Sequence, residues 1–347
     1  MKRSEKDKEV NQHQKRLFDI IKSKVSENVR LADEIEDLLG IGQDAAYKRI
    51  RGEQELKFSE LHKICAKYGV SIDEIFDYKS SQGALFNYAP VNIAEPESYI
   101  GYLKRLLGGM TALKSASDKE IIFSAQDIPF YHFTKFPELA FFKIYAWNDS
   151  INHKPMSYCK FCEHLEKDRI IDIYRQIDRA YMSIPSKEIW TDQTIDTTLR
   201  LLEHYYETGA FENKDAALFI LRQLSELLDK VRKFADEETK GKIPFFLYIS
   251  TVNLGNDYML SRKETQLSCM VKLFTINAMA TDNELFCSET KKWLEDLIVK
   301  STQISGTSIK ERIRFFQLSQ CKIDDLRKKI ESSESLRTCP SVTQNQS

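Results

Sequence analysis

Short amphipathic segments separated by brief turns occupy the first part of the chain, between about residues 11 and 77. Apolar side chains recur at helical spacing over residues 31–39, and two glycines then flank Ile41 in a tight turn. Residues 43–51 can form a second short helix that ends at Gly52, a residue type that tolerates left-handed backbone. The pattern therefore predicts a compact helical module.

A longer region with mixed periodicity follows residues 79–97, which contain glycine and proline and have no sustained period. We interpret residues 79–97 as an interdomain linker. Beta-branched and aromatic residues predict one strand and a turn within 119–133, and further strands within 243–281. Helical periodicity predicts helices near residues 99–113, 137–149, 158–182, 192–208, 213–239, 288–302 and 308–331. In the first of these helices we expect Gly108-Gly109 to introduce a bend or to admit a close neighbour.

These patterns predict a mainly α protein with two domains, as the length of 347 residues also suggests. A helical domain occupies residues 1–78, and residues 98–331 form a larger helix-dominated α+β domain with a small antiparallel sheet. Residues 332–347 are polar and aperiodic, so we expect a disordered tail. The scarcity of glycine (12) and proline (8) favours long helices over a turn-dense all-β fold.

The helix predicted at residues 43–51 divides its side chains between two faces. Ala46 and Ile50 are four residues apart and can pack against the module. The opposite face carries hydrogen-bond donors and an aromatic ring: Gln43, Tyr47, Lys48 and Arg51. A helix that enters a DNA groove needs this arrangement, because it must be held by apolar contacts while donors reach bases and phosphates.

This part of the sequence resembles the lambda-repressor-like (Cro, xenobiotic-response-element) helix-turn-helix family. The resemblance is carried by Leu39-Gly40-Ile41 at the turn, by Arg51-Gly52-Glu53 after the second helix, and by the segment KYGVSIDEIF at residues 67–76. That segment includes a capping box, Ser71-x-x-Glu74. The resemblance covers about 65 of the 347 residues. The sequence departs from the family at Glu36, where a small residue is usual, and at Ala46, where a branched apolar residue is usual.

The resemblance implies a five-helix DNA-binding domain at residues 1–78 and a sequence-specific transcription regulator. Residues 43–51 would be the recognition helix in the major groove of double-stranded DNA. We expect Gln43, Asp44, Tyr47 and Lys48 to read bases, and Arg49, Arg51 and Lys57 to contact phosphates. One such helix spans only a half-site, so we expect a homodimer. The C-terminal domain would dimerise the protein or sense a small-molecule or peptide effector.

Charge is balanced over the whole chain, with 51 Lys+Arg against 52 Asp+Glu. The first 80 residues contain 16 of each, so general polyanion binding is not indicated. Within them, residues 31–47 hold five acids and no base, whereas three basic residues fall within 48–51. Further bases, Lys2, Arg3, Lys6 and Lys8, are expected on a mobile arm. The alternative is a solvated surface on a module that only dimerises.

Other chemistry is less well supported by the sequence. Cys159, Cys162, His153 and His164 have the spacing of half a zinc site, but no second pair follows, so we expect buried thiols and no metal. We find no nucleophile-elbow, P-loop, zincin or dinucleotide-binding motif, and therefore expect neither an enzyme nor a cofactor.

Two further features leave alternatives open. The aromatic cluster between Phe130 and Trp147 is expected to pack in the core, or else to form a partner surface or a small-molecule pocket. Residues 201–224 resemble one tetratricopeptide helix pair, so a protein-interaction scaffold with a non-DNA-binding N-terminal module is the alternative function. The polar N-terminal stretch, the scattered cysteines and the short apolar runs predict a cytoplasmic protein without membrane spans.

Overall fold

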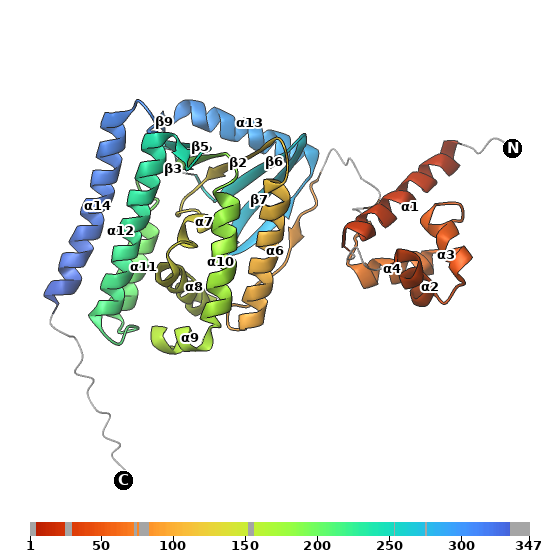
Figure 1. The fold of residues 1–347 in the computed structure, drawn as a ribbon, viewed down its shortest axis with the longest axis horizontal. Coiled ribbons are helices and arrows are strands. Elements are labelled where there is room, and N and C mark those ends of the chain that lie inside the picture. Colours follow the sequence, from red (N-terminus) through yellow and green to blue (C-terminus); the bar gives the residue numbers. More distant parts are fainter. Residues whose placement is uncertain are drawn as a thin grey trace, which may run out of the picture. The chain divides into compact units, whose positions relative to one another are not determined.

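A computed structural model of the chain describes residues 5–24, 30–72, 75, 83–151, 156–252, 254–274 and 276–333. The chain divides into two compact units, Met1–Leu85 and Phe86–Ser347. It is rich in helices and contains one large mixed sheet, which lies in the second unit (Figure 1). The helix-rich character that the periodicity predicts is thus confirmed.

The first unit is helical in its described part. Its helices are α1 (Glu5–Lys24), α2 (Leu31–Leu39), α3 (Gln43–Ile50) and α4 (Phe58–Tyr68). Gly40 and Gly69 end α2 and α4 with φ angles of 65° and 59°, in the left-handed region that favours glycine. The buried apolar side chains come from all four helices and the segment after α4: Leu17, Phe18, Ile21, Ile35, Ala46, Ile64, Val70 and Ile75.

Two sequence predictions for this unit concern its ends. The terminal helix expected from the capping box lies mostly outside the described residues, because Asp73, Glu74 and Phe76 are not described. Lys2 and Arg3 of the expected arm are also outside them. Lys6 and Lys8 belong to helix α1, so the prediction of a mobile arm is wrong for these two residues.

The sheet of the second unit is larger than predicted, and it is mixed. Its strands are β1 (Asn87–Tyr88), β2 (Lys119–Ser124), β3 (Ser186–Trp190), β4 (Thr239–Lys240), β5 (Ile243–Ile249), β6 (Tyr258–Lys263), β7 (Gln266–Phe274), β8 (Asn277–Thr281) and β9 (Thr302–Gln303). The strand order is β1-β8-β7-β6-β2-β3-β5-β4, and β9 pairs with β5. Strands β2, β3 and β5 are parallel, and the other pairs are antiparallel. The predicted small antiparallel sheet is therefore too small, and its direction is wrong for β2, β3 and β5, whereas β6, β7 and β8 are antiparallel as expected.

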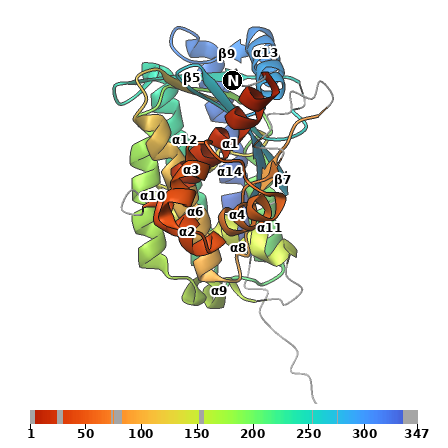
Figure 2. The same cartoon turned by 90° about the vertical axis from the view of Figure 1, so that its right-hand side faces the viewer.

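Helices cover both faces of this sheet. They are α6 (Pro96–Lys114), α7 (Phe130–Phe133), α8 (Pro137–Ile151), α9 (Tyr158–His164), α10 (Lys167–Tyr181), α11 (Asp196–Glu207), α12 (Lys214–Glu237), α13 (Glu284–Lys300) and α14 (Ile309–Ser332). The main core joins one sheet face to helices that include α6, α8, α10 and α12. A smaller core joins the opposite face to α13, which lies apart from α10 and α12 (Figure 2). Both faces are buried, as parallel strands require.

Several predicted boundaries differ from the structure. The expected linker at residues 79–97 contains strand β1 and the first two residues of α6. The helix expected at 158–182 is two helices, α9 and α10, separated at Leu165-Glu166. Helix α6 continues through Gly108 and Gly109 without interruption, and a Cβ atom at either position would meet nothing within 4 Å. The prediction that this glycine pair admits a close neighbour is therefore wrong.

The segment with tetratricopeptide-like sequence forms α11 and the first part of α12. Helix α12 packs against α14, α8 and the strands β4 and β5. The pair is thus one part of a layer over the sheet. Among the described residues, no helix is long and apolar enough to cross a membrane.

Candidate functional site

The turn between α2 and α3 fixes the orientation of α3 on the first unit. Gly40 adopts the left-handed conformation and donates its N–H to the carbonyl of Glu36, which closes α2. Helix α3 begins two residues after Ile41, and its Ala46 side chain is fully buried against the first unit's core. Helices α2 and α3 contact each other directly. The buried side of α3 therefore matches the face expected from the sequence.

The opposite side of α3 is exposed to solvent. Tyr47 keeps 43% of its surface exposed. The other exposed residues of α3 and of the segment after it include most of the predicted DNA contacts: Gln43, Asp44, Lys48, Arg51 and Lys57. The structure thus places these six side chains at the surface.

Two cations on this exposed face, Lys48 and Arg51, are paired with neighbouring acids. Lys48 Nζ lies 2.7 Å from Asp44 Oδ2, and Arg51 Nε lies 3.3 Å from Glu53 Oε1. The hydrogen bond to Asp44 raises the pKa of Lys48, and the same bond lowers the pKa of Asp44. Exposed ion pairs of this kind are weak because solvent screens them, so a phosphate group can replace the carboxylate.

Arg49 is not available for a DNA phosphate. Its side chain is 6% exposed, and it binds Glu60 through two hydrogen bonds, from Nε to Oε2 (3.0 Å) and from Nη2 to Oε1 (2.8 Å). Nη1 donates to the carbonyl of Ala45 and to Oε1 of Gln54. Arg49 therefore links α3 to α4 and to the segment between them, and the prediction that it contacts phosphate is corrected. Residue 49 follows Ala46 by three positions, which places it on the buried face.

Gln14 of α1 was missed by the sequence analysis. Its side chain is 8% exposed, and its Nε2 donates to the carbonyls of Arg49 (2.7 Å) and Gln54 (2.8 Å). Its Oε1 accepts from the N–H of Leu56 (3.0 Å). These bonds fix the segment that follows α3. Its spacing in the sequence could have identified it. Gln14 lies three residues before Leu17, so it is a polar residue on the apolar face of α1.

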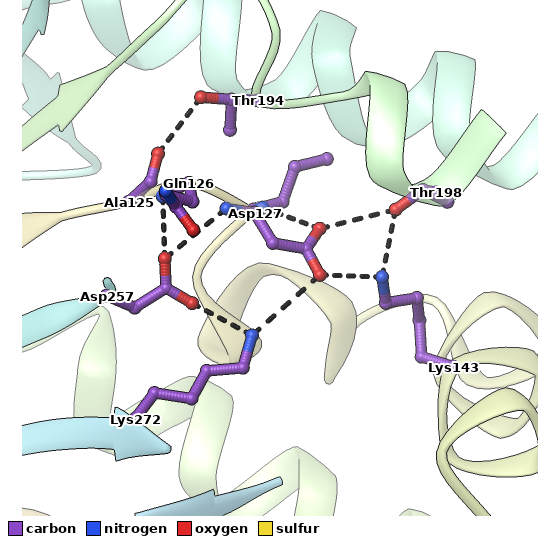
Figure 3. A network of polar contacts seen from close by, with 9 residues as sticks. Ala125, Gln126, Asp127, Lys143, Thr194, Thr198, Asp257 and Lys272 are labelled. Carbon is purple, nitrogen blue, oxygen red and sulfur yellow. Dashed lines mark hydrogen bonds and ion pairs between the residues drawn. The ribbon is translucent and has the colours of Figure 1, made fainter. Parts of the chain in front are cut away.

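The second unit contains a buried polar network that the sequence analysis also missed (Figure 3). Lys143 of α8 donates to Asp127 Oδ2 (2.7 Å) and to Thr198 Oγ1 (3.2 Å). Lys272 of β7 donates to Asp257 Oδ2 (2.8 Å) and lies 4.0 Å from Asp127 Oδ2. Lys143 stands within the apolar run LAFFKIYAW, and a charge in such a run indicates a buried partner.

Burial and ion pairing act against each other in this network. Burial raises the pKa of Asp127, but the charges of Lys143 and Lys272 outweigh it, so the pKa lies below its ordinary value. Burial lowers the pKa of Lys143, against the opposing effect of Asp127. For Lys272, burial is outweighed by Asp127 and Asp257, and its pKa is raised. Asp127 is therefore a carboxylate and Lys272 an ammonium group at neutral pH.

A second buried cluster centres on Glu188 of β3. Its carboxylate is bonded to His132 Nε2 (2.9 Å), Trp190 Nε1 (2.9 Å) and the hydroxyl of Tyr181. Burial raises the pKa of Glu188, but His132 and Tyr181 lower it further than burial raises it. The donors thus satisfy this charge inside the core, which indicates a structural group rather than an open site.

The cysteine pair and the aromatic cluster can now be placed. Cys159 and Cys162 lie on α9, and burial raises the pKa of both thiols, to about 11 for Cys162. His153 is outside the described residues, within which no three His, Cys, Asp or Glu side chains are grouped as metal ligands. Within the aromatic cluster, Phe141 and Phe142 are fully buried, whereas Phe130 and Trp147 are half-buried and line a pocket.

Comparisons with protein-family models, with curated proteins and with solved structures gave no match to the chain.

Proposed function

We propose that the chain is a sequence-specific DNA-binding transcription regulator, with α2 and α3 as its helix-turn-helix. The observation that carries the proposal is the division of α3 into a buried side and an exposed side. Ala46 and Arg49 hold one side against the unit, and Tyr47 and Lys48 project from the other. A side that presents an aromatic ring and charged donors to solvent is suited to a DNA groove.

The dimensions of α3 support this role. An α-helix with its side chains is about 10–12 Å in diameter, so α3 fits the major groove of B-form DNA, which is about 12 Å wide. Gly42 is its N-cap residue, and near its C-terminal end Gln14 donates to the carbonyls of Arg49 and Gln54. A recognition helix held in this way keeps its orientation while its exposed side chains adapt to the bases.

We assign roles to the exposed residues by their chemistry. Gln43 can form paired hydrogen bonds with adenine, Lys48 can donate to guanine, and Asp44 can accept from cytosine. Arg51 and Lys57 would bind phosphates. Arg49 takes the structural role of joining α3 to α4. Contacts by Gln43, Lys48 and Arg51 require exchange of their present partners, Asp33, Asp44 and Glu53, which costs little at an exposed site.

The protein is proposed to act as a homodimer. A single short recognition helix reads only a half-site, and two-fold related half-sites supply the usual specificity of this kind of module. The second unit is then the dimerisation and effector-sensing part. This proposal places the protein in the cytoplasm, with access to DNA.

Selection of bound duplexes from a random pool tests the proposal. We expect the full-length chain to enrich a two-fold symmetric sequence whose half-sites are about one helical turn apart. Its affinity should fall with salt, with a slope near −0.9 for each phosphate that is neutralised. A pool without any enriched sequence, together with no salt-dependent binding to duplex, would instead favour a protein-interaction scaffold.

A further inference from the structure

A pocket opens beside the carboxyl end of strand β2, on the sheet face that carries the main core. Its floor is a row of side chains that are paired across three strands, Phe123 with Met259 and Met259 with Met270. At β2 the sheet changes from parallel pairing with β3 to antiparallel pairing with β6. The chain leaves the sheet there through residues 125–129, and such strand ends are common ligand sites in open sheets.

Aromatic side chains form the walls of this pocket. Phe130 and Phe133 of α7, Trp147 of α8 and Tyr102 of α6 all line it. The volume of about 700 Å³ includes open solvent at the mouth, so it is an upper limit for the space that an occupant can fill. Several lining side chains are only half-buried, so the pocket reaches the surface. An apolar cavity with flat walls favours a flat aromatic occupant.

One end of the pocket is polar. Asp127, Asp257 and Lys272 line it there, and the ammonium groups of Lys143 and Lys272 lie 5.8 Å and 5.9 Å from the centroid of the Trp147 ring. These four ionisable groups are two acids and two lysines, joined as shown in Figure 3. An ionised ligand would bring a further charge into a mostly buried site, which is costly unless that charge is paired there.

Lys272 is the group best placed to bind a ligand. Its side chain is 33% exposed, whereas that of Lys143 is 1% exposed. Within the described part of the chain, Lys272 Nζ makes one hydrogen bond, to Asp257, although an ammonium group has three donors. The carboxylate of Asp257 uses its other oxygen to accept from the N–H of Gln126. The polar end can therefore offer a donor to a ligand oxygen.

We infer that this pocket binds an uncharged, largely aromatic small molecule that carries one acceptor oxygen, which bonds to Lys272. We further infer that it is the effector site of the protein, and this second part alone rests on the proposed regulatory function. Neither a metal nor a covalent step is involved.

The binding test uses the full-length protein and the uncharged fluorophore propionyl-dimethylaminonaphthalene, whose ring system and ketone match the inferred class. We expect saturable, blue-shifted emission with one site per chain. Ala278→Leu and Leu106→Trp fill the pocket from the sheet and from α6, and each should abolish the signal. Ala280→Leu is the matched control, because residue 280 lies on the same strand and face but does not line the pocket.

The ligand class is tested by competition. Acetylnaphthalene should displace the fluorophore about tenfold more strongly than ethylnaphthalene, because only the ketone accepts a bond from a charged donor. Lys272→Met should remove this preference while ethylnaphthalene still competes. Naphthoate should compete more weakly than the ketone. If the fluorophore still binds to both Ala278→Leu and Leu106→Trp, the pocket is not its binding site. If naphthoate competes as well as the ketone, the inference that the ligand is uncharged is wrong.

The effector role has its own readout. With duplex selected as described above, saturating fluorophore should change duplex affinity by about fivefold or more. An unchanged affinity, with fluorophore binding intact, overturns the effector role and leaves the ligand site. Failure of duplex selection with intact fluorophore binding would count against the DNA-binding proposal and not against the pocket.

Discussion

Arg49 and Glu60 form a two-bond ion pair inside the first unit, with only 6% and 13% of their side chains exposed. Glu60 also accepts from the backbone N–H of Lys57. The Glu60 carboxylate thus connects helices α3 and α4 and the segment between them. The pair buries a basic residue that the sequence analysis assigned to DNA phosphate, whereas Tyr47 and Lys48 on the other side of α3 are exposed.

Arg49→Ala should destabilise the first unit by about 3 kcal/mol, because it leaves the Glu60 carboxylate buried without its partner. Hydrogen exchange of α2–α4 amides in the full-length chain measures this loss. Lys67→Ala removes an exposed ion pair with Glu34 and is the control, with an expected effect of at most about 1 kcal/mol. Equal protection in the two variants would show that the Arg49 pair does not hold α3.

Asp44→Asn should increase the affinity of the protein for random-sequence duplex. The change frees Lys48 from its 2.7 Å ion pair and removes a negative charge from the exposed side of α3. The salt slope should become steeper by about one unit per chain. Asp37→Asn, at an exposed position of α2, changes the net charge equally and is the control. Unchanged or weaker duplex binding by Asp44→Asn would mean that DNA does not bind to the exposed side of α3.

Lys240→Met should stabilise the second unit at neutral pH by about 2 kcal/mol. Lys240 is 1% exposed, its Nζ has no hydrogen-bond partner in the described structure, and it lies over the ring of Tyr181. Burial lowers the pKa of Lys240 well below 10.5, against the opposing charge of Glu188, so the unfolded chain binds the proton more tightly. Stability of the unchanged protein should therefore rise as pH approaches 10.5.

The gain from Lys240→Met should accordingly shrink as pH increases. Chemical denaturation at several pH values measures it, with Lys242→Met at the exposed neighbouring position as the control. A net loss of stability at neutral pH would mean that the contacts with Tyr181 and Glu188 exceed the cost of burying this amine.

Periodicity predicted the long helices because their apolar faces are wide. It failed at β3, where Lys187 and Glu188 interrupt a five-residue strand. Glu188 is fully buried, and its three donors come from α7, α10 and Trp190, so no local pattern marks it as a core residue. Without β3 the parallel part of the sheet could not be recognised, because β2 and β5 pair only through that strand.

The candidate site was only partly predictable for a related reason. Spacing correctly placed Tyr47 and Lys48 at the surface and Ala46 in the core. The basic residues near the end of α3 were treated as one cluster, although Arg49 falls on the side of Ala46. The partners of Arg49 and Lys143 are remote or lie on other elements, and sequence spacing does not reveal such tertiary ion pairs.

Lys48→Ala/Arg51→Ala, compared with Lys15→Ala/Lys22→Ala, tests the central claim most directly. Both variants lose two exposed cations from the first unit, but only the first loses them from the proposed DNA-binding face. Affinity for the selected duplex, measured over a salt series, should fall about tenfold or more in the Lys48/Arg51 variant. Its salt slope should also decrease by about one to two units per chain, and the control should be nearly unchanged. Full duplex affinity in the Lys48/Arg51 variant would contradict the account.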